Sequence, residues 1–106
     1  MNYNCKEEIL LKNYMPDKTT LKSMSTFFYA FSDDTRLKII ILLMMKPFCV
    51  GDITNLLNIN QTTVSHQLKI LKGLNIVDFD RQGKNIIYYI KNPKVENVFD
   101  ATVGCI

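Results

Sequence analysis

A run of short hydrogen-bonding side chains occupies much of residues 61–72, and no acidic residue interrupts it. Such donors and acceptors can read base edges in the major groove of double-stranded DNA, which is wide enough to admit a helix. An acid there would repel phosphate, so its absence favours a DNA-binding face over an ordinary solvated one. The candidate DNA-binding residues of this stretch are Gln61, Thr62, Thr63, Ser65, His66 and Lys69.

Two cations near a glycine form a second candidate site. Arg81 and Lys84 flank the Gln82-Gly83 pair, which predicts a turn. Five basic and two acidic residues lie between positions 61 and 91, whereas the rest of the chain has eight of each, so the net charge of +3 comes from this stretch. Clustered positive charge attracts a polyanion. We expect these cations to contact DNA phosphates and to contribute affinity with little sequence information.

The spacing of apolar residues predicts that the first group of polar side chains shares one face of a helix over 61–72. Asn60 is placed to cap the start of this helix, and Gly73 is expected to supply the left-handed residue after its end. Apolar residues recur at i, i+4 and i+7 and should face the core, which leaves the polar residues on the opposite side. These core-facing residues are Val64, Leu68 and Leu71.

The neighbouring segments predict how this helix is held. A short helix over 50–57 and a three-residue turn at 58–60 precede it, which together make a helix-turn-helix unit over 50–72. The apolar period then changes from 3.6 to 2, which predicts a β-hairpin with strands 76–81 and 85–91. A hairpin directly after a helix-turn-helix unit is a wing, here spanning 76–91.

Further helices are predicted over 4–14, 18–31, 33–45 and 93–103. Asn4 should cap the first and Ser32 the third, which is apolar nearly all round and should lie at the centre of the core. The predicted fold class is mainly α with a small hairpin (α+β), a winged helix-turn-helix. The chain's 106 residues are enough for one domain, spanning 1–106.

At these segments the chain resembles the ArsR/SmtB family of bacterial winged-helix repressors. The resemblance covers most of residues 27–92. It implies a homodimer formed mainly by the first and last helices (approximately 4–31 and 93–106), operator binding near a promoter, and release when an effector binds, often a metal ion. The matching segments are FSDDTRLKIIILL (31–43), CVGDI (49–53), TTVSHQLKILKGLNIV (62–77) and RQGKNIIYYI (81–90).

The residues themselves also favour a dimer. Four aromatic side chains lie within residues 27–31, too many for one core face, and the last helix is apolar on more than one side. Surplus apolar surface in a small domain suggests a partner, and a two-fold homodimer is the commonest solution. Such a dimer would place two reading helices about one DNA turn apart on a near-palindromic operator.

The metal-binding motifs of the family are incomplete here. Thiol-based sensors in it often carry Cys-x-Cys at the segment matching 49–51, but this chain has Cys49-Val50-Gly51. Its zinc and cobalt sensors carry Asp-x-His followed by His-x-x-His or His-x-x-Glu in the last helix, whereas residues 92–106 contain no histidine. We therefore expect the last-helix metal site to be absent.

The three cysteines leave several interpretations open. Cys49 could join Cys5, across the dimer, in a thiolate site for a soft ion such as Cd(II), Pb(II), As(III) or Zn(II). Cys49 or Cys105 could instead be a redox thiol. Alternatively, Cys49 is simply a small core residue and the other two lie near the chain ends. No cofactor is required, and a soft metal ion would act as an effector.

Other function classes fit less well. The single histidine and the lack of a nucleophile motif, phosphate loop or paired carboxylates argue against an enzyme. The longest apolar run, 39–45, is too short to cross a membrane, and the N-terminal residues lack a signal-peptide pattern, so a cytoplasmic protein is expected. The alternative is a winged-helix module for protein–protein contact. The acid-free face and basic wing favour a sequence-specific DNA-binding regulator, a dimeric repressor.

Overall fold

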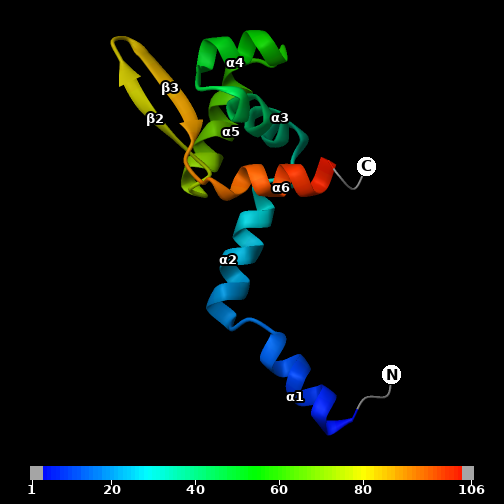
Figure 1. The fold of residues 1–106 in the computed structure, drawn as a ribbon. Helices are drawn as coiled ribbons and strands as arrows, with labels where there is room; N and C mark the ends of the chain where they lie inside the picture. Colours follow the sequence, from blue (N-terminus) through cyan, green and yellow to red (C-terminus); the bar gives the residue numbers. More distant parts are fainter. Residues whose placement is uncertain (1–3, 104–106) are drawn as a thin grey trace.

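The computed structural model describes residues 4–103, which form six helices and a three-stranded antiparallel sheet. Figure 1 shows that α3, α4, α5, α6 and the hairpin form one body, from which α2 and then α1 extend. The predicted winged helix-turn-helix is therefore confirmed. The helices are α1 (Cys5–Tyr14), α2 (Lys18–Tyr29), α3 (Asp34–Met45), α4 (Val50–Leu57), α5 (Gln61–Gly73) and α6 (Lys94–Val103), and the strands are β1 (Phe48–Cys49), β2 (Val77–Gln82) and β3 (Asn85–Ile90).

The start of α3 differs from the sequence prediction. The cap is Asp33, whose carboxylate accepts a hydrogen bond from the Arg36 backbone N–H at 3.0 Å, and not Ser32. Helix α2 ends at Tyr29, two residues earlier than expected, and the chain then makes a tight turn. Within that turn the Ser32 hydroxyl donates to the Tyr29 carbonyl at 2.8 Å, and it lies one residue ahead of the cap position that Asp33 occupies. Asn4 caps α1 as predicted, in a reciprocal pair with Glu7.

The end of α5 also differs. Gly73 is the last helical residue, and the left-handed conformation belongs to Asn75, with a φ of 61°. The Leu74 N–H bonds to the Ile70 carbonyl at 3.0 Å, which carries the helical pattern past the glycine. Asn tolerates the left-handed region better than most residues, so the reversal needs no glycine.

The hairpin has a two-residue turn. Strands β2 and β3 pair from Val77 with Ile90 to Gln82 with Asn85, leaving Gly83 and Lys84 at the tip. Gly83 has a φ of 64°, which most residues with a side chain, Asn apart, adopt only under strain. Strand β1, which pairs with β3, was not predicted, because two residues are too few to show the alternation of apolar and polar side chains.

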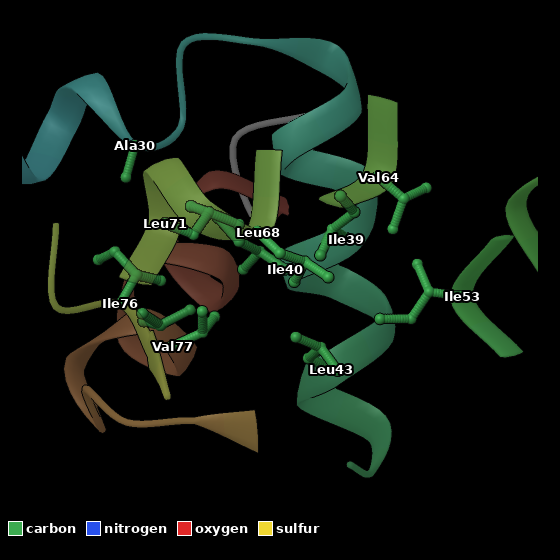
Figure 2. Close-up of a cluster of buried hydrophobic side chains, with 11 residues drawn as sticks. Ala30, Ile39, Ile40, Leu43, Ile53, Val64, Leu68, Leu71, Ile76 and Val77 are labelled. Carbon is green, nitrogen blue, oxygen red and sulfur yellow. The ribbon is translucent and has the colours of Figure 1, made fainter. Parts of the chain in front are cut away.

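The core lies where α3, α5 and the base of the hairpin meet. Figure 2 shows the buried side chains of α3 and α5 directed toward one another, with Ile76 and Val77 beside them. The central place predicted for α3 is confirmed, because Ile39, Ile40 and Leu43 are buried. The three core-facing residues predicted on α5 are all fully buried: Val64, Leu68 and Leu71.

Helices α1 and α2 bury none of their residues, although both carry large apolar side chains. The surplus of apolar surface predicted for the helix over 18–31 is therefore confirmed, and α1 adds exposed apolar residues that were not predicted. Within residues 4–103, no helix has the length and apolar content to span a membrane. The exposed apolar residues of these two helices are Ile9, Leu10, Leu11, Tyr14, Leu21, Met24, Phe28 and Tyr29.

Candidate nucleic-acid interface

The polar face of α5 points to solvent. Because its opposite side is locked into the core, the helix cannot turn this face inward. Five of the six predicted residues are exposed, and Thr63 is half-buried beside the start of the helix. The exposed residues are Gln61, Thr62, Ser65, His66 and Lys69. We call this group, together with Thr63, the α5 reading face.

The start of α5 is built to accept an anion. The Asn60 side-chain oxygen accepts from the Thr63 N–H at 2.8 Å, and the Asn60 carbonyl accepts from the Val64 N–H at 3.1 Å. The N–H groups of Gln61 and Thr62 lie ahead of these bonds, at the positive end of the helix dipole. The first turn of α5 has no acidic side chain. A phosphate can therefore bind at this end.

The turn between α4 and α5 positions the reading face on the body. Asn58 closes α4 in the left-handed conformation, with a φ of 53°. The Ile59 N–H then bonds to the Thr54 carbonyl at 3.3 Å. Ile53, on the core side of α4, is fully buried, so both helices of the unit share one core. This is the helix-turn-helix geometry predicted from the sequence.

The wing carries its cations at the exposed end. Burial along β2 falls from Val77, which is fully buried, to Arg81, which is exposed, and Lys84 is exposed at the tip. Figure 1 shows the hairpin projecting from the body beside α5. The two cations thus lie on the part of the wing that is farthest from the core.

The acidic residues of the wing face away from Arg81. Successive side chains of a strand alternate sides, so Asp78 and Asp80 share one face of β2 and Arg81 lies on the other. Tyr89 lies opposite Asp78 in the sheet. Partial burial raises the pKa of the Tyr89 hydroxyl, and the negative charges of Asp78 and Asp80 raise it further. On the other face the Lys72 ammonium lies 5.4 Å from the centre of the Phe79 ring. The face shared with Arg81 therefore gathers positive charge.

A buried cation behind the reading face was missed by sequence reasoning. Arg36 is 5% exposed, and its guanidinium donates to the Gln67 side-chain oxygen of α5 at 3.1 Å. Residues 33–45 read as an apolar helix, and one arginine in it carries no signal of a long-range partner. Only its position within such a helix hinted that it would be buried.

The structure does not bring the cysteines together within one chain. Cys5 is exposed at the start of α1, whereas Cys49 is half-buried directly before α4. Figure 1 shows α1 and α4 at opposite ends of the molecule. Cys105 lies outside the described residues. The two described thiols can therefore meet only through a second copy of the chain.

The surroundings of Cys49 do not form a complete metal centre in one chain. A side-chain carbon placed on Gly51 would lie 4.0 Å from the Cys49 sulfur, so this position is close to the thiol, but glycine has no side chain that could bind a metal ion. Among residues 4–103, no three His, Cys, Asp or Glu side chains are grouped as metal ligands would be. A soft ion at Cys49 would need ligands from elsewhere, because Zn²⁺ in proteins takes about four.

Comparison with known sequences finds a family and many relatives. Residues 33–78 match the family described as "Bacterial regulatory protein, arsR family". The chain is 42% identical over 83 residues to the cadmium resistance transcriptional regulatory protein CadC of Listeria innocua, covering 77% of this chain and 70% of that protein. It is 40% identical over 72 residues to the transcriptional repressor SdpR of Bacillus subtilis, covering 68% of this chain and 79% of that protein.

Solved structures of transcriptional regulators share this fold. The transcriptional repressor BigR from Xylella fastidiosa has a TM-score of 0.77 and 25% identity, covering 84% of this chain and 91% of that one. A homodimeric winged helix-turn-helix DNA-binding domain from Mycobacterium bovis has a TM-score of 0.75 and 26% identity, covering 87% of each chain.

Proposed function

Because this chain belongs to the ArsR family of bacterial transcriptional regulators, we propose that it is a homodimeric repressor that binds a specific operator through α5 and the wing. The observation that carries this proposal is the α5 reading face, which is exposed and acid-free on a helix whose other side is locked in the core. The protein acts by binding and not by catalysis, in the cytoplasm where its DNA target lies.

The proposed DNA contacts fall into two groups, those to base edges and those to phosphates. Thr62, Ser65, His66 and Lys69 face the base edges, because their side chains are exposed along one side of α5. Gln61 and Thr63 lie at the end of the helix that favours phosphate. Arg81 and Lys84 hold the DNA backbone from the wing and add affinity that salt weakens.

The dimer forms through the helices that leave apolar surface uncovered. Phe28 and Tyr29 of α2 are exposed, α1 buries no residue, and Val103 of α6 is exposed. A second copy would cover this surface and repeat the reading face by two-fold symmetry. The operator is then near-palindromic, with half-sites about one DNA turn apart.

Effector control is proposed at Cys49. This half-buried thiol lies directly before α4, the first helix of the helix-turn-helix unit, so a change at the sulfur acts next to the reading helix. The name of the Listeria innocua relative connects that protein with cadmium. We propose that a soft metal ion, with Cys5 supplied by a second copy, or oxidation of the thiol weakens operator binding. Cys105 is the other proposed redox thiol.

The test of the proposal is binding to two duplexes. One is selected from a randomised pool by repeated rounds of binding to the protein, and the other has the same composition in scrambled order. We expect preference for the selected duplex, and steep loss of affinity for both between two salt concentrations. Failure to enrich any sequence, with little binding at low salt, would favour a protein–protein module instead.

A further inference from the structure

We propose that Arg36 is a positioning residue that holds α5 against the end of α2, and that this connection sets the selectivity of the reading face for its operator. The inference rests on the proposed function and adds to it a residue that contacts no DNA. Its basis is a hydrogen-bond network that joins three helices at one buried guanidinium.

On one side, the guanidinium binds the end of α2. It donates to the Tyr29 carbonyl at 3.1 Å, to the Ala30 carbonyl at 3.4 Å and to the Ser32 hydroxyl at 3.3 Å. It also lies 4.7 Å from the centre of the Tyr29 ring. Carbonyls at a helix C-terminus carry partial negative charge and lack helical partners, so a cation is stabilised there.

On the other side, the guanidinium binds α5. One nitrogen donates to the Gln67 side-chain oxygen at 3.1 Å. Gln67 is half-buried and lies three residues from Val64 and four from Leu71, at the edge of the core-facing side. It directly follows His66, whose side chain belongs to the reading face. The contact therefore holds the middle of the reading helix.

Because Arg36 is buried, its guanidinium depends on these hydrogen bonds. Within residues 4–103 the ion pair that the structure holds joins Lys12 to Glu8, so no carboxylate there neutralises Arg36. A buried cation without an ion-pair partner depends on every donor finding an acceptor. The planar guanidinium reaches these acceptors in fixed directions, which a lysine cannot imitate. The network thus specifies an angle between helices as well as a contact.

The angle matters because α2 is part of the proposed dimer surface. Two reading helices must match two half-sites at once, so each α5 must be held at a fixed orientation to the dimer helices. A small misplacement loses base contacts, which are directional, and leaves phosphate attraction nearly unchanged. Loosening this connection should therefore lower selectivity more than general DNA affinity.

The test compares three variants with the selected and scrambled duplexes described above. Gln67→Met keeps the side-chain length and removes the oxygen that accepts from Arg36. Arg36→Lys keeps the positive charge and removes the planar guanidinium. Ser32→Ala removes one acceptor of Arg36 on the α2 side and leaves the Tyr29 carbonyl to the same nitrogen, so it is the milder change to the same network. For Gln67→Met we expect about tenfold weaker binding to the selected duplex, and for the scrambled duplex a change below about twofold. Ser32→Ala should weaken binding to the selected duplex less than Gln67→Met does and leave binding to the scrambled duplex unchanged.

The double variant separates positioning from direct contact. If Gln67 itself touched DNA, Arg36→Lys and Gln67→Met would act independently and their effects would add. We expect instead that the double variant is no weaker than the stronger single variant, at equal helical content by circular dichroism. Equal losses on both duplexes, additive effects, or an unchanged ratio would overturn the inference. Failure of the wild type to enrich any sequence would count against the proposed function instead.

Discussion

The side-chain oxygen of Asn60 accepts a hydrogen bond from the backbone N–H of Thr63 at 2.8 Å, directly before the residues proposed to enter the major groove. This cap starts α5 with no negative charge at the end that is proposed to face phosphate. An aspartate would cap the helix equally well, so a substitution can add a negative charge while the capping hydrogen bond is kept.

Asn60→Asp should retain stability and weaken DNA binding. The unfolding free energy should change by less than about 0.5 kcal/mol, because Asn and Asp are similar caps. The added charge should cost about 1 kcal/mol in binding to either duplex at low salt. Denaturant unfolding and fluorescence anisotropy measure the two quantities. Asn60→Ala is the contrast, since it should cost about 1 kcal/mol of stability. Unchanged binding by the aspartate variant would place phosphate elsewhere.

His66→Ala and Lys69→Ala should each reduce selectivity. Loss of a base contact is expected to weaken binding to the selected duplex by about 1–3 kcal/mol, with a smaller change on the scrambled duplex. Both side chains are exposed, so folding should be unaffected. Titration of the two duplexes at one salt concentration measures the difference. Equal effects on both sequences would argue against the assigned reading face.

Lys84→Ala should weaken binding to all sequences alike. The lysine is exposed at the tip of the wing, and a lost phosphate contact is expected to reduce the salt slope by about one unit per site. Lys12→Ala is the control, because Lys12 lies in α1, away from the wing in Figure 1. Binding across a series of salt concentrations gives the slope. A specific loss on the selected duplex alone would mean that the wing reads bases.

Phe28→Asp should dissociate the dimer. Both Phe28 and Leu56 are 58% exposed, but only Phe28 lies on the proposed dimer surface. Burying a charge in an apolar interface is costly, so the dimer dissociation constant should rise about a hundredfold or more. Leu56→Asp should leave it unchanged. Sedimentation equilibrium measures both. If the two variants behaved alike, the second copy would have to bind elsewhere.

Cys49→Ser should remove the response to an effector while leaving basal operator binding intact. The thiol is half-buried and makes no side-chain cap to α4, so serine fits at the same place. Operator binding by the reduced protein is measured with Cd(II), Zn(II) and As(III), and again after mild oxidation. Cys5→Ser distinguishes the two routes, because it should abolish a metal response and spare an oxidative one. A wild type that ignores all four treatments would make Cys49 a packing residue.

Local pattern alone was enough to predict α5 and its exposed side. The i, i+4, i+7 spacing of Val64, Leu68 and Leu71 determined which side of α5 is buried, and hence which residues face outward. Asn60 was recognisable as a cap because capping is a bond between near neighbours in the chain. The hairpin followed from the change of period at residue 76. Each of these features depends on residues a few positions apart, so the order of residues is enough to predict it.

The contacts between distant segments were decided only by the tertiary structure. The bond from Arg36 to Gln67 spans 31 positions, and β1 exists only because β3 lies beside it. The helix ends near Ser32 and Gly73 differ for another reason, because local bonds compete there: the Ser32 hydroxyl donates to the Tyr29 carbonyl and the Leu74 N–H to the Ile70 carbonyl. Packing chooses among partners that local propensity ranks almost equally. For that reason the sequence was enough to predict which side of α5 is exposed, whereas the bond from Arg36 to Gln67 is seen only in three dimensions.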